Sequence, residues 1–220
     1  MFKRISILLA VFAFSVSAQA VSVDFTGQDW KDAINSSSYQ TSATVGNVTL
    51  STSKSWHYLN FNGSDSEVRG CVSGSGLHDL ACLGDGIGIR NDEISGYEEL
   101  LIEFAEAVDV TKIYLLDLFG AEKTGEKALI INSNNIDKIV TGTVDSNGNS
   151  NPGGFFSVEY SVIEGQGLTS ILLKGYKDCF SDYALAGLEI APSAVPVPGA
   201  AILFGSALLG LFGFKRRRIA

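Results

Sequence analysis

Short apolar runs separated by turn residues fill the sequence from Val21 to Ile190, and this spacing constrains the fold more than any other feature. Each run has four to ten residues, and Ser, Thr, Asn and Gly occupy most of the intervals. No stretch has the 3.6-residue apolar period of a long amphipathic helix. The pattern predicts an all-β, antiparallel β-sandwich, with a jelly roll as the expected topology and another Greek-key sandwich as the alternative.

Twelve runs are expected to form strands, and Asp29–Ile34 is expected to form a single helical turn with Trp30 and Ile34 on one face. The expected strands are Val21–Phe25, Thr44–Ser51, His57–Phe61, Glu67–Cys71, Gly86–Ile89, Glu98–Phe104, Val110–Phe119, Ala128–Ile131, Lys138–Val144, Phe155–Ser161, Ser170–Lys174 and Ala184–Ile190.

The run Val110–Phe119 is apolar on both faces, which predicts a central strand. Together with Leu100–Phe104 it forms the best-defined part of the expected core. Asp117 lies near the end of this run, where we expect the strand to reach the surface.

The first twenty residues have the composition of a secretory signal peptide. Lys3 and Arg4 form the charged part, Ile5–Val16 the apolar part, and Ala18–Ala20 a small-residue cleavage site. We expect export through the Sec translocon and cleavage by signal peptidase, which would leave a mature chain that begins at Val21.

The other end of the chain, residues 193–220, has three parts in sequence. The first is the extended motif Val195, Pro196, Val197 and Pro198, the second is the uncharged run Gly199–Phe214, and the third is the basic cluster Lys215, Arg216, Arg217 and Arg218. As a helix the uncharged run would span about 24 Å, close to the hydrocarbon thickness of a bilayer. The basic cluster would then stay on the cytoplasmic side. A permanent single-span anchor is the simpler interpretation of such a tail.

This three-part tail resembles the PEP-CTERM sorting signals of Gram-negative bacteria, in the variant with a Val-Pro-x-Pro motif. It departs from the Pro-Glu-Pro form at the first two motif positions. The resemblance implies cleavage by an exosortase in the inner membrane, followed by delivery to the cell surface or to an exopolysaccharide matrix. It covers the tail, whereas the body (residues 21–192) resembles more loosely the β-rich ectodomains that precede such tails.

Charge is distributed unevenly between the ends and the body. The body holds all twenty-four acidic residues but only ten of the sixteen basic ones, so that its formal charge is −14. Because phosphate binding needs a basic face, this charge argues against nucleic acid as a partner and against docking on anionic lipid. It is compatible with divalent cations and with neutral glycans.

Three cysteines, Cys71, Cys82 and Cys179, allow three disulfide pairings. We expect a disulfide between Cys71 and Cys82, because the protein is exported and these two are nearest in sequence. A zinc site is disfavoured because the spacing lacks Cys-x-x-Cys.

Carboxylates in two places leave open a structural Ca²⁺ site, not necessarily a single one. Asp85, Asp92 and Glu93 lie in the glycine-rich stretch 84–93, and a glycine-rich edge strand with solvated acids is the favoured interpretation there. Asp24 and Asp182 are candidates by analogy with jelly rolls in which Ca²⁺ joins the first strand to the last. No cofactor other than this possible structural calcium is expected.

No catalytic motif is found, and we expect a protein that is not an enzyme. His57 and His78 are the only histidines, and neither belongs to a triad pattern. Glu98 and Glu99 are adjacent, so that strand alternation would place them on opposite faces and not across a cleft. Trp56 and Tyr58 flank His57, a pattern typical of core more than of an exposed patch that stacks on sugar rings.

The sequence therefore predicts an exported, exosortase-processed protein of the cell surface or matrix, with an adhesive, structural or carbohydrate-binding role in exopolysaccharide or biofilm. The alternative is a secreted hydrolase that acts on matrix polysaccharide.

Overall fold

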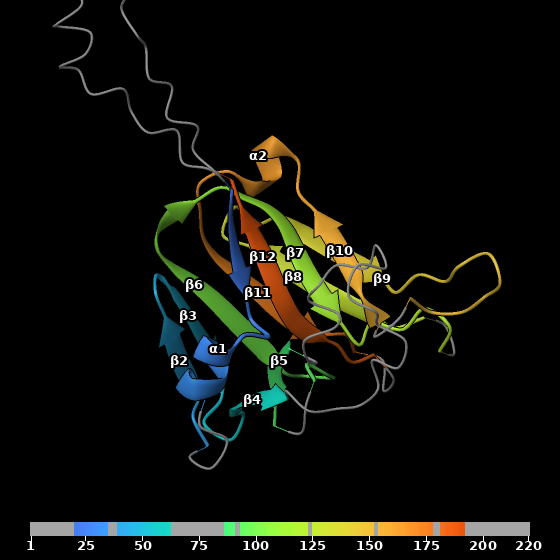
Figure 1. The fold of residues 1–220 in the computed structure, drawn as a ribbon, viewed down its shortest axis with the longest axis horizontal. Helices are drawn as coiled ribbons and strands as arrows, with labels where there is room; N and C mark the ends of the chain where they lie inside the picture. Colours follow the sequence, from blue (N-terminus) through green and yellow to red (C-terminus); the bar gives the residue numbers. More distant parts are fainter. Residues whose placement is uncertain are drawn as a thin grey trace, which may run out of the picture. The chain divides into compact units, whose positions relative to one another are not determined.

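The described part of the body contains twelve strands and two short helices (Figure 1). The computed structural model describes residues 20–34, 39–62, 86–90, 93–122, 125–151, 154–177 and 181–191. The strands are β1 Val21–Asp24, β2 Ser42–Val45, β3 Val48–Thr52, β4 Leu59–Asn62, β5 Gly86–Ile89, β6 Glu99–Val108, β7 Val110–Leu116, β8 Lys127–Asn132, β9 Asp137–Thr141, β10 Phe156–Glu159, β11 Leu168–Gly175 and β12 Ala184–Ile190; the helices are α1 Gln28–Ala33 and α2 Val162–Gly165.

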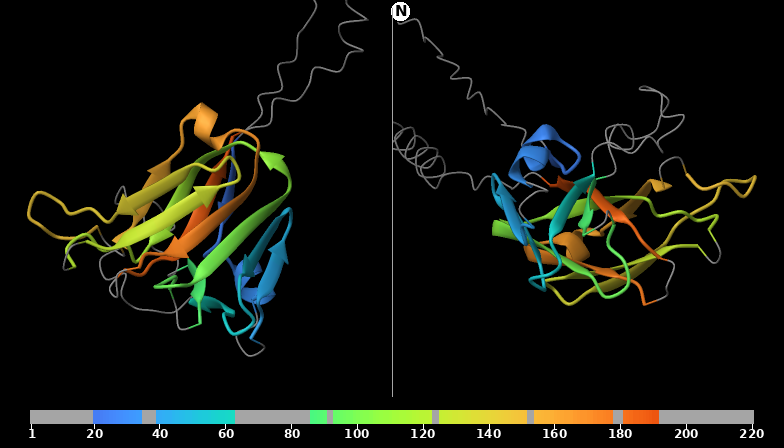
Figure 2. Two further views of the ribbon diagram at one scale, coloured as in Figure 1. Left: turned by 180° about the vertical axis from the view of Figure 1, so that it is seen from behind. Right: turned by 90° about the horizontal axis from the view of Figure 1, so that it is seen from below.

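The strands form two antiparallel sheets, as expected for an all-β sandwich. Sheet A has the order β10-β7-β12-β5-β4, with β1 also paired to β12, and sheet B has the order β2-β3-β6-β11-β8-β9. In Figure 1 the strands β12, β7 and β10 lie in front of β11, β8 and β9, and the left panel of Figure 2 shows the same sheets from behind.

Four strand pairs are nested along the chain. β1 pairs with β12 and β7 with β10 in sheet A, while β6 pairs with β11 and β8 with β9 in sheet B. The strands β2 to β5 are inserted between β1 and β6: β2 and β3 extend sheet B beyond β6, whereas β4 and β5 join sheet A beside β12. Successive pairs of the nested set, from β1–β12 through β6–β11 and β7–β10 to β8–β9, therefore alternate between the two sheets.

Side chains from both sheets meet in one apolar core. Leu50, Ile102 and Ile171 of sheet B and Ile113 and Leu185 of sheet A are all fully buried. Burial of each such side chain contributes about 1.5 to 3 kcal/mol relative to leaving it exposed. The core therefore holds the two sheets face to face.

Helix α1 closes one margin of this core. Trp30 and Ile34 are 2% and 3% exposed, which confirms the expected apolar face of this turn. The Trp30 ring lies 5.0 Å from the ring of Phe25, centroid to centroid.

Strand β7 is central in sheet A, between β10 and β12, as its two apolar faces predict. Ile113 and Leu115 lie in the core between the sheets, while Tyr114 and Leu116 are buried on the other face beside Ala186. The preceding strand β6 belongs to sheet B, so the two runs contribute to the core from opposite sides.

The prediction that Asp117 reaches the surface is wrong. Asp117 does follow the last residue of β7, but it is only 9% exposed and has φ +58°. The left-handed turn redirects the chain so that Leu118 enters the core, and the Leu118 amide donates to the Gly154 carbonyl at 3.1 Å.

The single strand expected over Thr44–Ser51 is also wrong, because this segment forms the hairpin β2–β3. Val45 pairs with Val48 across a two-residue turn, and Gly46 at its first position has φ +57°. Glycine adopts this left-handed conformation without steric cost, which explains the break in the run.

Several predicted features lie outside the described residues. They are residues 1–19 of the signal peptide, the motif 195–198, the run 199–214, the basic cluster 215–218, the strand expected at 67–71, all three cysteines, Asp85 and Asp92. In the part of the chain that the structure does describe, no helix is both long enough and apolar enough to cross a membrane.

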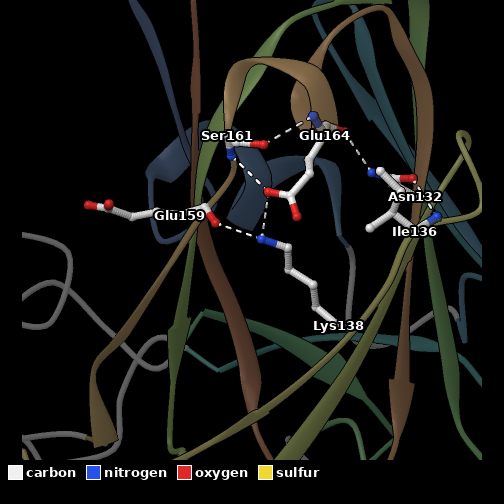
Figure 3. Close-up of polar contacts among 6 residues, drawn as sticks. All are labelled: Asn132, Ile136, Lys138, Glu159, Ser161 and Glu164. Carbon is white, nitrogen blue, oxygen red and sulfur yellow. Dashed lines mark hydrogen bonds and ion pairs between the residues drawn. The ribbon is translucent and has the colours of Figure 1, made fainter.

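A polar network holds α2 against sheet B (Figure 3). Glu164 accepts from the Ser161 amide at 2.8 Å and from Lys138 Nζ at 3.0 Å, and Ser161 Oγ accepts from the Glu164 amide. Asn132 Nδ2 donates to the Glu164 carbonyl at 2.8 Å, while its Oδ1 accepts from the amides of Asn134 and Ile136. Asn132, 3% exposed, therefore satisfies three backbone groups.

We expect Asn132→Ala to lower the free energy of unfolding by about 2 kcal/mol, because it removes three part-buried hydrogen bonds to the backbone. Urea denaturation measures this loss. Asn147→Ala, in an exposed loop, is the control and should change stability by less than about 0.5 kcal/mol. Equal midpoints for the two variants would contradict the role of Asn132.

Candidate functional site

An open cavity of about 670 Å³ lies at one end of sheet B. It is lined by Lys54, Gly96, Tyr97, Glu98, Glu99, Leu129, Lys174, Gly175, Tyr176 and Lys177. These residues come from the loop after β3, the turn before β6 and its first residue, the first half of β8, and the end of β11 with the two residues that follow it.

Strand register places the sheet residues of this cavity side by side. Lys174 of β11 lies opposite Glu99 of β6 on one side and opposite Leu129 of β8 on the other. Their sequence neighbours Leu100 and Leu173 are buried in the core. Because side chains alternate along a strand, Glu99, Leu129 and Lys174 face outward.

The turn 95–98 forms one wall, and it packs directly on β11. The Gly175 amide donates to the Glu98 carbonyl at 3.0 Å, and the Glu98 amide donates to the Ser95 carbonyl at 2.9 Å. A Cβ atom on Gly175 would lie 2.2 Å from the carbonyl carbon of Ser95 and 2.5 Å from the Gly96 nitrogen. Only glycine at position 175 allows this close approach.

We expect Gly175→Ala to push the turn 95–98 away from β11 and to destabilise the protein by about 1 to 3 kcal/mol. Chemical denaturation measures the loss. Gly27→Ala is the control, because its Cβ would make only an ordinary 3.4 Å contact at φ −77°. If Gly175→Ala cost no more stability than Gly27→Ala, the close packing of this wall would be refuted.

The two carboxylates at the cavity are both engaged by protein groups. Glu99 Oε1 lies 2.5 Å from Lys174 Nζ, and this hydrogen bond holds the pKa of Glu99 below its ordinary value. Glu98 accepts from the amide and hydroxyl of Ser95 at 3.1 and 3.3 Å.

The expectation that Glu98 and Glu99 face opposite sides does not hold, since both border the cavity. Glu98 lies one residue before β6, so strand alternation does not govern its direction. The Glu98 carboxylate instead points back towards Ser95, from which it accepts two hydrogen bonds.

Aromatic rings border the cavity and extend beyond it. Tyr97 is 77% exposed, and the ring of Tyr176 carries Lys127 Nζ at 5.0 Å from its centroid. Lys54, which lines the cavity, lies 5.9 Å from the centroid of Trp56, itself 65% exposed.

The pattern Trp56-His57-Tyr58 therefore divides between core and surface. His57 is 5% exposed, as the core interpretation predicts, but Trp56 points into solvent. The three residues precede β4, where the strand period does not yet apply. An exposed aromatic group thus lies beside the cavity.

This arrangement has the chemistry of a saccharide-binding surface. Aromatic faces pack against the apolar faces of sugar rings, while lysine and carboxylate groups bond to hydroxyls and to charged substituents. A volume of this size is typical of small-ligand sites.

A second polar cluster lies near the start of β8. Glu126 is 4% exposed, and one of its carboxylate oxygens accepts from the Phe119 amide at 2.6 Å. Burial and a hydrogen bond to Asp182 raise the pKa of Glu126 to about 9, and the negative charge of Glu122 acts in the same direction. The pair Glu126–Asp182 therefore holds a proton at neutral pH.

We expect stability to fall as the pH rises from about 4.5 towards 9. Over this range Glu126 stays protonated in the folded protein but is ionised in the unfolded chain, which binds fewer protons. The urea midpoint measured at pH 5, 7 and 9 should decrease stepwise, and Glu126→Gln should flatten this slope. An equally steep slope in that variant would assign the pH dependence to other groups.

Of the five carboxylates in the calcium prediction the structure describes three, Asp24, Glu93 and Asp182, and their hydrogen bonds differ. Asp24 lies opposite Gly187 in the β1–β12 pair, and its Oδ1 accepts from the amide and the hydroxyl of Thr26 at 2.8 and 2.6 Å. Asp182 instead bonds to Glu126. Glu93 accepts the Ile89 amide through its backbone carbonyl. Among the residues described, no three His, Cys, Asp or Glu side chains are grouped to hold a metal ion.

Most cavity residues carry no signal in the sequence. Lys54, Tyr97, Leu129, Lys174 and Tyr176 lie far apart in the chain, and only the pairing of β6, β8 and β11 brings them together. A single polar or aromatic residue at the end of a strand does not reveal which strand lies beside it.

Comparison with protein-family models gave no match to the chain, and comparison with curated protein sequences gave none either.

Proposed function

We propose that this protein is an exported, non-enzymatic carbohydrate-binding component of the cell surface or extracellular matrix of a Gram-negative bacterium, with a jelly-roll body. The nested pairs β1–β12, β6–β11, β7–β10 and β8–β9, with successive pairs in alternate sheets, support the jelly-roll assignment. In this assignment β2 to β5 are an insertion after the first strand.

The cavity at the end of sheet B carries the carbohydrate-binding proposal. It combines an exposed tyrosine ring, a second ring under a lysine, and charged groups whose positions are fixed by strand pairing. A surface tyrosine and a surface tryptophan near one open cavity have no role in the core. Stacking on sugar rings would explain why both aromatic side chains are exposed there.

We expect Tyr97→Ala to weaken glycan binding about tenfold, because it removes one stacking face worth about 1 to 2 kcal/mol. A glycan array identifies a ligand, and calorimetry with that ligand measures the change. Ile163→Ala is the control, because Ile163 is 82% exposed on α2 and does not line the cavity. Unchanged affinity of Tyr97→Ala would exclude the cavity as the binding site, and release of reducing sugar would favour the hydrolase alternative.

We also propose that the tail, residues 193–220, is an exosortase signal. In this scheme Gly199–Phe214 holds the exported chain briefly in the inner membrane, and cleavage near Val195–Pro198 releases the body. The two prolines keep the motif extended, which suits entry into a peptidase cleft.

Replacing Pro196 and Pro198 by Ala should cause the uncleaved chain to accumulate in the inner membrane. Mass spectrometry of the native and variant proteins reads the cleavage points at both ends, and it also reads the pairing of Cys71 and Cys82. Normal processing of the variant would count against the sorting signal.

A further inference from the structure

We propose that the cavity at the end of sheet B takes acidic saccharides, such as uronic acids, in preference to neutral ones. This inference rests on the proposed carbohydrate binding at the same cavity. It concerns the charge of the ligand, and it is carried by the distribution of cationic side chains over an otherwise acidic body.

Cationic side chains are scarce in the described part of the body, and they gather at the cavity. The described residues include eight lysine and arginine side chains against eighteen aspartates and glutamates. Three of the eight, Lys54, Lys174 and Lys177, line the cavity, and a fourth, Lys127, lies over the ring of Tyr176.

The acidic residues of the cavity leave part of this positive charge uncompensated. Three lysines line the cavity against two glutamates, so the lining has a formal charge of +1. The Glu98 carboxylate keeps its charge while it accepts from Ser95, and that of Glu99 pairs with Lys174. Within the described chain, neither Lys54 nor Lys177 forms an ion pair with another residue. Lys177 is exposed, and Lys54 is half-buried with its ammonium group 5.9 Å from the centroid of the Trp56 ring. The Lys54 charge also helps to lower the pKa of Glu99, so Lys177 is the less compensated of the two.

The other four described cations, Lys31, Arg90, Lys112 and Lys138, do not line the cavity. Lys112 lies within 4 Å of Glu159 and Glu189 on sheet A, and Lys138 belongs to the α2 network. An anionic polymer would be repelled by most of the acidic body and attracted where the lysines gather. The distribution of charge therefore favours the cavity, where three cations gather, over the rest of the described body.

Ring stacking and charge pairing fit the same ligand. A uronic acid presents a sugar ring to an aromatic face and an equatorial or axial carboxylate at its rim. The exposed ring of Tyr97 and the amino groups of Lys54 and Lys177 border one cavity. Lysine binds a carboxylate as a point charge, so the expected preference is for acidic sugars as a class.

The test uses an array on which every acidic oligosaccharide is paired with its own methyl ester, which has the same sugar rings without the charge. The full chain in detergent is applied with and without EDTA. We expect the acidic forms to bind about tenfold more tightly than their esters, with or without EDTA, and to lose this advantage as the salt concentration rises from 0.05 to 0.5 M.

Lysine variants show which side chains are responsible for the preference for acidic saccharides. Lys54→Gln and Lys177→Gln should each weaken binding of the acidic form about fivefold and leave the ester unchanged, whereas Tyr97→Ala should weaken both. Lys112→Gln, on the other sheet, is the matched control and should bind like the unaltered protein.

Three other outcomes would overturn the proposed preference for acidic saccharides, and they can be told apart. Equal binding of acid and ester, or preference for the ester, would refute the charge preference but leave carbohydrate binding intact. Acidic binding that disappears in EDTA and is unaffected by the lysine variants would point to a divalent cation as the bridge. Absence of binding to the whole array would overturn both the charge preference and the proposed carbohydrate binding.

Discussion

The antiparallel pairing of β6 with β11 is the constraint on which the rest of the structure depends. It brings the start of β6 beside the end of β11, and so places Glu99 opposite Lys174 on the outer face while Leu100 and Leu173 enter the core. Because the side-chain period of a strand is two, a slip of one residue would expose the apolar set and bury the ion pair. Core packing and the candidate site are thus set by the same register.

The sequence predicts the strands well where local pattern decides, and poorly where a turn or a tertiary contact does. Gly86–Ile89 and Ala184–Ile190 have the predicted bounds, and the both-sided apolar pattern of β7 correctly marks a central strand. The β2–β3 hairpin was hidden by an apolar pattern that continues through Gly46. Sheet order is not readable from one sequence, because it depends on which strands pair across long separations.

The candidate site could be predicted from the sequence even less well than the strands. The sequence draws attention to acidic clusters, yet Asp24 bonds locally to Thr26 and Asp182 bonds to Glu126. Asp117 is buried at a turn, where its φ is left-handed. The alternation of apolar residues in a sequence does not show where such a turn occurs. The lysines of the cavity are ordinary strand-end residues until the sheet is assembled. Charge summed over the whole body conceals them, since the acidic majority lies elsewhere.

The two ends of the described body lie together, far from the cavity. Val21 pairs with Ile190, and the Ala191 amide donates to the Asp109 carbonyl, at the end of β6 opposite Glu99. The ten residues of β6 separate these ends of the sheet by about 33 Å. A label, a fusion partner or a solid support joined directly at Val21 or at Ala191 is therefore attached at the end of the sheets away from the cavity, where a large polymer would bind.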